Sequence, residues 1–490
     1  MPLQTALEAL KRKDFAAARD LMARGDMTAF GVPHFLIKGL AELSLKDWEA
    51  CLATFAAATG RFPDHALFWL NRGIAEENLR LVNAAVVSQE RCLALNPLQA
   101  EACGNLSNLY RNTRRGVEAE AMARRALALG ADRGDALNCL GLALNRQGKF
   151  DEARETFIQA HQAAPDNAAI LANHANLETN VFDFDAAWQL FAAARAISDE
   201  AVFRHDEGLA RLLFGDHERG FTLFEARLEM PEALRIQPLC PRWQGESLKG
   251  KKLLIVAEQG FGDVIHFCRY QTCLPEGELV WAVPKNLVRL LKDSLRGEVL
   301  DETAALPVCD YFLPMMSLGL LNSVSPEGIH LFAPPTPLLP TGTHPLKIGI
   351  VWAGSKTHRR DEERSIPLKL FAPILESVAA DFYAPFLGEA LEEIGDFQIT
   401  RLDPLLTDFA DTAALLRQMD CLITVDTAAA HVAGALGVRT FLLLPRCPDW
   451  RWGVTGDTTP LYPSMTLVRQ ETHGDWSGAI ERIHALVKNL

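Results

Sequence analysis

Three clusters of polar residues each follow a predicted strand and could carry chemistry. The first is EQGFGD (258–263), a glycine-rich turn in which Asp263 opens the next helix. The second is SKTHRRDEERSIP (355–367), a cation-rich loop, and the third is TVDTAAAHVAGALG (424–437), whose helix begins with small residues. A carboxylate can act as a general base, arginine binds phosphate oxygens, and a helix N-terminus favours an anion. Together these kinds of residue suit a reaction on a phosphate-bearing ligand.

Each cluster also has a purely structural interpretation. Asp263 could only cap the helix that follows it, and the cationic segment could be a solvated loop. Asp426 and Thr427 form a common type of helix cap, and His431 could face either a phosphate or the core. The order and combination of the three clusters therefore carry more weight than any one of them.

Strands that alternate with helices surround these clusters. KKLLIVAEQGFGDVIHFCRY (251–270) is typical of a buried strand, a turn and a helix, and ELVWAVP (278–284) of another strand. LKIGIVWAG (346–354) predicts a strand, CLITVDTAAAHVAGALG (421–437) a strand that leads into a helix, and RTFLLLP (439–445) a further strand. This alternation predicts parallel sheets covered by helices.

A proline-rich segment divides this half of the chain. LFAPPTPLLPTGTHP (331–345) holds five prolines and suits a stiff linker or an extended crossover. We therefore expect two α/β lobes, with a ligand cleft at the carboxyl ends of their strands.

The first half of the chain is a repeat array. Pro63 and Pro97 lie 34 residues apart, and Pro165 lies twice that distance further on. A 34-residue period is that of the tetratricopeptide repeat, in which small residues pack two antiparallel helices together. Five units match well, and a sixth (202–233) matches loosely. Such arrays present extended surfaces, so we expect a bound protein partner, although the array could equally serve only as a support.

Composition excludes several classes of protein. The chain is 49% hydrophobic and 23% charged, with a net charge of −13, which excludes a mainly disordered chain and argues against a nucleic-acid binder. No apolar run reaches the roughly 20 residues of a membrane helix, and the N-terminus has no secretory signal pattern. The ten cysteines form no CxxC pair, so we expect buried free thiols and a cytoplasmic protein.

The motifs GDVIH (262–266), RSIP (364–367) and DTAAAH (426–431) resemble, in order and spacing, the lipopolysaccharide heptosyltransferases of the GT-B glycosyltransferase fold. The resemblance implies that Asp263 is the general base, that Arg364 contacts the donor phosphate, and that the turn from Asp426 to His431 binds the pyrophosphate. Arg364 stands where that family has lysine, and Ala428 where it has glycine.

A second resemblance covers the whole chain. With VWAG (351–354), PDWRWG (448–453) and YPS (462–464), the chain is similar to bacterial tetratricopeptide-repeat glycosyltransferase-like proteins, some of them linked to flagellin glycosylation. The predicted fold is an all-α repeat array (1–235) followed by a compact, two-lobed, Rossmann-type GT-B domain. Its acceptor lobe is expected at 245–335 and its nucleotide-sugar lobe at 346–490.

The function implied is an inverting, metal-independent glycosyltransferase that needs no cofactor beyond its nucleotide-sugar donor. A protein acceptor such as flagellin would be recruited by the repeats. Two alternatives stay open: a non-catalytic repeat scaffold with a vestigial nucleotide-sugar fold, and a transferase for glycan or lipid-linked acceptors. A homo-oligomer also stays open.

The candidate site residues have three further roles besides the base Asp263. Donor phosphate binding is expected of Arg364, Lys356, Arg360, Asp426, Thr427, Ala428, Ala429 and His431. The turn on the acceptor side comprises Glu258, Gln259, Gly260, Gly262 and His266. A wall against the sugar or base is expected of Trp352, Gly354, Ser355, Trp450 and Arg451.

Overall fold

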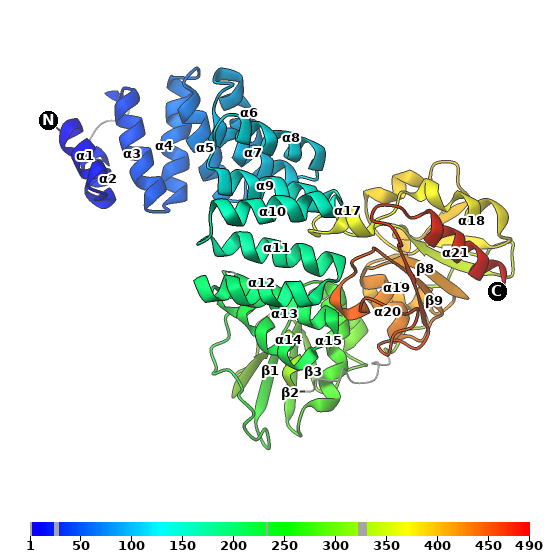
Figure 1. The fold of residues 1–490 in the computed structure, drawn as a ribbon. Coiled ribbons are helices and arrows are strands. Elements are labelled where there is room, and N and C mark those ends of the chain that lie inside the picture. The colour runs from blue at the N-terminus through cyan, green and yellow to red at the C-terminus, as the bar shows by residue number, and fades with distance from the viewer. Residues whose placement is uncertain (1, 24–28, 232–233, 322–330) are drawn as a thin grey trace. The chain divides into compact units, whose positions relative to one another are not determined.

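The computed structural model describes residues 2–23, 29–231, 234–321 and 331–490 (Figure 1). Residues 24–28, in the predicted repeat array, and residues 322–330, in the first predicted lobe, lie outside the described residues. The chain divides into two compact units. The first comprises residues 1–178 and 189–198, and the second comprises residues 179–188 and 199–490.

The first unit is all helical and repeats every 34 residues, as predicted. Its helices are α1 (Pro2–Lys11), α2 (Phe15–Ala23), α3 (Val32–Ser44), α4 (Trp48–Arg61), α5 (Ala66–Asn78), α6 (Val82–Leu95), α7 (Ala100–Asn112), α8 (Gly116–Ala128), α9 (Arg133–Arg146), α10 (Phe150–Ala163), α11 (Ala168–Val181) and α12 (Phe184–Ile197), the last two of which are shared with the second unit. The turn inside successive pairs contains one residue with left-handed backbone, namely Lys46, Arg80, Arg114 and Gly148. These positions lie 34 residues apart, so the backbone conformation repeats with the same period as the sequence.

Small residues allow the two helices of a pair to touch. A Cβ added to Gly39 would lie 2.4 Å from the Phe55 ring, and one added to Gly141 would lie 2.8 Å from the Phe157 ring. Both aromatic rings are fully buried. Tight interdigitation of this kind is what makes each pair a packing unit.

Besides residues 179–188, the second unit contains α13 (Ala201–Phe214) and α14 (His217–Phe224) and continues into two parallel sheets. The first sheet has the order β3-β2-β1-β4, from β1 (Lys252–Val256), β2 (Glu278–Val283), β3 (Glu298–Asp301) and β4 (Tyr311–Pro314). The second has the order β10-β9-β8-β5-β6-β7, from β5 (Lys347–Val351), β6 (Asp381–Ala384), β7 (Ile399–Arg401), β8 (Cys421–Val425), β9 (Thr440–Leu444) and β10 (Met465–Arg469). The strands predicted around 253, 280, 349, 423 and 442 are confirmed.

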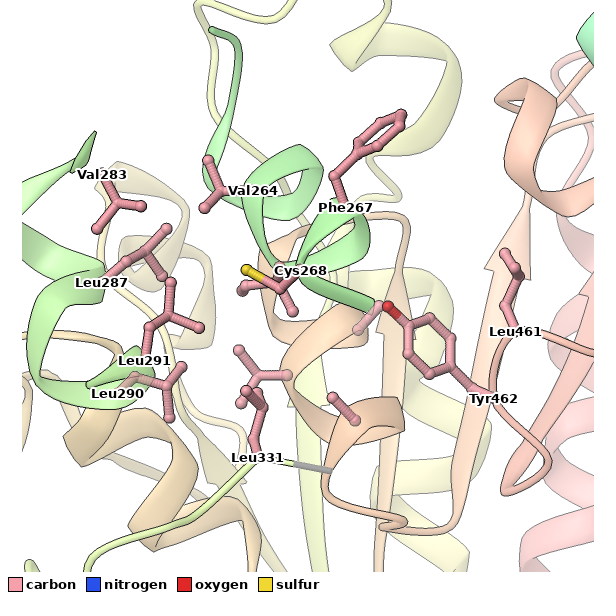
Figure 2. Packing of buried hydrophobic residues seen from close by; sticks show 14 of the residues in the cluster. Val264, Phe267, Cys268, Val283, Leu287, Leu290, Leu291, Leu331, Leu461 and Tyr462 are labelled. Carbon is pink, nitrogen blue, oxygen red and sulfur yellow. The ribbon is translucent and has the colours of Figure 1, made fainter. Parts of the chain in front are cut away.

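One hydrophobic core spans both sheets. It contains Leu253 and Leu279 of the first sheet together with Leu442 and Leu467 of the second. Figure 2 shows Val264 of α15 (Phe261–Phe267) and Cys268, the residue that follows this helix. Both lie between the leucines of α16 (Lys285–Leu291) and the ring of Tyr462. The proline-rich residues 331–345 form neither helix nor strand, as expected of a connector.

All ten cysteines are free thiols, as predicted, but only six of them are buried and the other four are half-buried. Among the described residues, no helix combines the length and apolarity needed to cross a bilayer.

Candidate functional site

The three polar clusters meet where the strand order of each sheet reverses. In the first sheet β1 lies between β2 and β4, and the turn 258–263 follows β1. In the second sheet β5 lies between β8 and β6, so the loop after β5 and the turn after β8 are neighbours. Ligands of open parallel sheets bind at such reversals, outside the carboxyl ends of the strands. The topology thus creates one site from segments that are about 60 to 170 residues apart in sequence.

The N-termini of two helices converge at this site. A Cβ added to Gly262, in the first turn of α15, would lie 2.9 Å from the His431 ring and 3.7 Å from the Cα of Ala428. Ala428 and Ala429 open α20 (Ala428–Ala435), whose N-cap is Thr427. Only a glycine on one helix and small residues on the other permit this approach. Both helix N-termini contribute positive potential at this point.

Arg364 is fixed beside the N-terminus of α20. Its Nη1 donates to the backbone carbonyl of Asp426 over 2.7 Å, and its Nε lies 3.4 Å from Asp361 Oδ1. The side chain is only 14% exposed. Gly354 makes room for it, because a Cβ there would lie 2.5 Å from Arg364 Nη2. The guanidinium is therefore oriented before any ligand binds.

The Gly354→Ala variant should displace Arg364 without removing its charge. The added methyl group overlaps Nη2, so the guanidinium must leave the Asp426 carbonyl. We expect anion binding at the α20 N-terminus to weaken by about tenfold, the value of one charge-assisted hydrogen bond. Titration with inorganic pyrophosphate would measure this change. Gly478→Ala is the matched control, because a Cβ at Gly478 meets nothing within 4 Å. Unchanged affinity in Gly354→Ala would show that the Arg364 position is irrelevant to anion binding.

Asp263 occupies the third position of α15, and both of its carboxylate oxygens have partners. Oδ2 accepts the Gly260 backbone N–H over 2.9 Å, and Oδ1 forms an ion pair with Arg451. Arg451 also donates to Asp449 Oδ1 over 2.7 Å. Asp263 therefore contacts both the start of its own helix and the loop that carries Arg451.

His431 and His266 are buried in the same region but differ in their contacts. His431 Nδ1 lies 3.0 Å from the Tyr462 hydroxyl, its ring stacks on Trp452, and burial lowers its pKa to about 3. His266 is 1% exposed, and neither ring nitrogen has a hydrogen-bond partner among the described residues. Burial and the neighbouring cations keep the pKa of His266 well below its usual value, so both rings are neutral.

A cavity of about 430 Å³ adjoins His266 and Arg451. Its other walls are Phe221, Tyr270 and Trp450, together with Leu461 and polar residues from the start of α14. A volume of this size accommodates a small ligand or a side chain. Phe221, Tyr270 and the α14 residues were not among the sequence-predicted candidates, because only the tertiary packing brings α14 to this cavity.

The remaining turn residues serve the local structure. Glu258 is buried, and it accepts hydrogen bonds from Arg227 over 2.8 and 3.1 Å and from the Met316 backbone N–H over 2.7 Å. Burial raises the pKa of Glu258 despite Arg227. The backbone carbonyl of Gln259 accepts a hydrogen bond from Arg235 over 2.5 Å.

The candidates after β5 are dispersed. Lys356 is 68% exposed and pairs with Glu389, while Arg360 pairs with Glu363 and donates to the Cys447 carbonyl. Ser355 Oγ lies 2.8 Å from Thr357 Oγ1 at the exposed surface. Trp352 is fully buried and packs against Phe386 in the core of the second sheet, and it does not line the cavity beside His266.

Sequence and structure comparisons found several similar proteins. No family model matches the chain. Protein FlbA of Caulobacter vibrioides is 24% identical over the whole of this chain and 89% of its own length. POLLENLESS 3-LIKE 2 of Arabidopsis thaliana is 30% identical over 110 residues, which are 22% of this chain and 25% of that protein.

Solved tetratricopeptide-repeat structures are similar to part of this chain. One from Parabacteroides merdae covers 47% of this chain and 92% of its own, at 16% identity and a TM-score of 0.41. YrrB, described as having an unusual peptide-binding site, covers 36% of this chain and 91% of its own, at 19% identity and a TM-score of 0.27. The direct evidence for a repeat array is the series of helix pairs that recur every 34 residues. The protein has a tetratricopeptide-repeat array followed by a parallel-sheet α/β region.

Proposed function

We propose that the α/β region is a GT-B-type glycosyltransferase that transfers a sugar from a nucleotide-sugar to an acceptor hydroxyl. The observation that carries the proposal is the convergence of the α15 and α20 N-termini, with Arg364 at 2.7 Å from the Asp426 carbonyl. This arrangement suits a diphosphate, whose charge two helix N-termini and one guanidinium can neutralise. Asp263, from the other sheet, supplies a carboxylate at the same place.

In the proposed reaction the acceptor oxygen attacks the anomeric carbon as the bond to the diphosphate breaks. Asp263 accepts the proton of the acceptor hydroxyl, and its ion pair with Arg451 holds the carboxylate in position. Negative charge that develops on the leaving diphosphate is stabilised by Arg364 and by the first turn of α20. No metal is required, because these groups supply the compensating charge, and direct displacement inverts the anomeric configuration.

On the acceptor side, the cavity beside His266 is where an acceptor group would enter. The neutral, unpartnered imidazole offers one donor and one acceptor to a hydroxyl. The repeat array would bind the protein that carries this hydroxyl, with flagellin as one example. Glycan and lipid-linked acceptors fit the same chemistry.

A non-catalytic scaffold is the second candidate function. It is favoured by Asp263, because one of its oxygens caps α15 and the other pairs with Arg451. In that case Asp263 would hold the two sheets together and transfer no proton.

Thermal-shift titration with nucleotide-sugars and nucleoside diphosphates distinguishes the two functions. A donor at one hundred times its Kd adds about 2.7 kcal/mol of stability, which raises Tm by several degrees. We expect Arg364→Gln to weaken the binding of that donor about tenfold to a hundredfold. We expect Asp263→Asn to keep the binding and to lose transfer by at least a hundredfold.

Arg401→Gln is the control for Arg364→Gln, because Arg401 is an exposed, ion-paired arginine of the same unit. If Asp263→Asn transferred sugar at the wild-type rate, Asp263 would not be the base. If no nucleotide or nucleotide-sugar shifted Tm, the scaffold would be the better description.

A further inference from the structure

Three aromatic rings line the cavity of about 430 Å³ beside His266. Trp450 meets the rings of Phe221 and His266 edge-on, with centroids 5.6 Å apart in both pairs. Phe221 also lies edge-on against Tyr270, at 6.5 Å. Aromatic rings prefer such edge-to-face contacts, so these walls suit one more aromatic ring.

Two wall residues of this cavity carry buried polar atoms that lack a partner. His266 is 1% exposed, and neither of its ring nitrogens has a hydrogen-bond partner in the described part of the chain. The Nε of Arg451 is also buried without a partner there, although its terminal nitrogens bind Asp449 and Asp263. Buried polar groups are nearly always hydrogen-bonded in folded proteins. These atoms therefore point to a ligand with a hydrogen-bonding group that reaches the buried end of the cavity.

The exposed end of the cavity is acidic. Asp216 and Glu218, at the start of α14, line it, and Glu218 is exposed. Two carboxylates at an entrance repel an anion. The cavity is therefore distinct in its charge from the α20 N-terminus, and a diphosphate is a poor occupant for it.

The number of unpartnered polar groups separates a sugar from a phenol as the occupant. A pyranose carries hydroxyl groups around its whole ring, and each of them needs a partner once it is buried. Asp216 already accepts hydrogen bonds from Arg211 over 3.1 Å and from the Arg219 backbone N–H over 3.4 Å. A phenol buries an apolar ring and one hydroxyl, which matches the aromatic walls and the imidazole of His266.

We propose that this cavity binds a tyrosine side chain of a polypeptide acceptor, and that the sugar is transferred to a hydroxyl group on a neighbouring residue. The proposal rests on the glycosyltransferase function and names its acceptor as a polypeptide. Asp263 does not line the cavity but is joined to it by Arg451. The tyrosine is therefore the group that is recognised, and a hydroxyl beside it is the group that meets the base.

Two small probes of equal shape test the recognition without knowledge of the donor. 4-Fluorophenol and 4-fluorotoluene are titrated into the full-length protein at pH 7, where a phenol keeps its proton, and binding is followed by ¹⁹F NMR. We expect 4-fluorophenol to bind about tenfold more tightly, the value of one hydrogen bond to a buried partner. An excess of methyl glucoside should not displace it.

Two variants separate the polar contact from the apolar one. His266→Phe should abolish the preference for the phenol, because phenylalanine has no ring nitrogen. The control is His484→Phe, at a half-buried histidine 2.7 Å from Ser377 Oγ, which should keep the preference. Trp450→Phe should weaken both probes by a similar factor and keep their ratio, because it removes wall area and leaves His266 in place. This variant provides the test if His266→Phe fails to fold, which its thermal unfolding would reveal.

Each outcome decides for or against the tyrosine. Equal affinity for the two probes, or binding of neither, would overturn the proposal, and displacement of 4-fluorophenol by methyl glucoside would assign the cavity to a sugar instead. If the phenol bound as expected but no nucleotide or nucleotide-sugar bound, the transferase would fall and the recognition of tyrosine would stand.

For a donor found by thermal shift, serine peptides that carry tyrosine or alanine beside the serine extend the test to the reaction. We expect the tyrosine peptides to have a KM about tenfold lower at similar kcat, and His266→Phe to remove this difference. Equal KM values in the wild type would overturn the role of the cavity in acceptor choice.

Discussion

Arg227→Met should destabilise the α/β unit by about 3–5 kcal/mol, the usual cost of removing one member of a buried ion pair. The Arg227 side chain is 6% exposed and pairs with Glu258 and Glu225. It also donates to Ser317 Oγ over 2.9 Å. Methionine would fill part of the volume but would leave Glu258 buried without its guanidinium. We expect Tm of this unit to fall by roughly 10 °C, measured by differential scanning calorimetry.

The control is Arg482→Met, which removes an exposed pair with Asp457 and should change stability by less than about 1 kcal/mol. The double variant Arg227→Met, Glu258→Leu should recover part of the loss, because it leaves no buried charge unpaired at this position. A Tm for Arg227→Met equal to that of Arg482→Met would show that the buried pair contributes nothing. In that case Glu258 would have no structural role in the ion pair and could contact an acceptor instead.

Asp426→Asn should stabilise the protein at neutral pH. The pKa of Asp426 is raised from 3.8 to about 6 in the folded state. When the pH lies between these two pKa values, the folded protein keeps a proton that the unfolded chain releases. The free energy of unfolding therefore falls as the pH rises through this window. Above it, the wild type carries a penalty of about 3 kcal/mol that asparagine does not have.

Thermal unfolding at several pH values measures this difference. Asp426→Asn should exceed the wild type in Tm at pH 8, and the difference should vanish near pH 4, where the wild-type carboxyl group is protonated in both states. Asp449→Asn should show the opposite sign at pH 8, because the pKa of Asp449 is lowered and its charge pairs with Arg451. A lower Tm for Asp426→Asn at pH 8 would mean that its charge is well accommodated in the folded state.

Local patterns in the sequence determined the elements of this protein. The 34-residue period appears as prolines and small residues in the sequence, and it reappears as left-handed turn residues 34 positions apart. Buried apolar runs followed by glycine-rich or small-residue turns marked β1, β5 and β8, together with α15 and α20. These features depend on neighbouring residues, so a single sequence is enough to predict them. The order of the three clusters also indicated that Asp263, Arg364 and Asp426 belong to one site.

Only the tertiary structure decided which side chains meet. Asp263 pairs with Arg451 across 188 residues of sequence, and Glu258 pairs with Arg227 rather than facing a ligand. Trp352 lies in the hydrophobic core, while Phe221 of α14 lines the same cavity as Trp450. Such pairings depend on the strand order of two sheets and on the core that joins them. The raised pKa of Asp426 has the same origin, because it is set by burial and by Asp449, which arrives from a different loop.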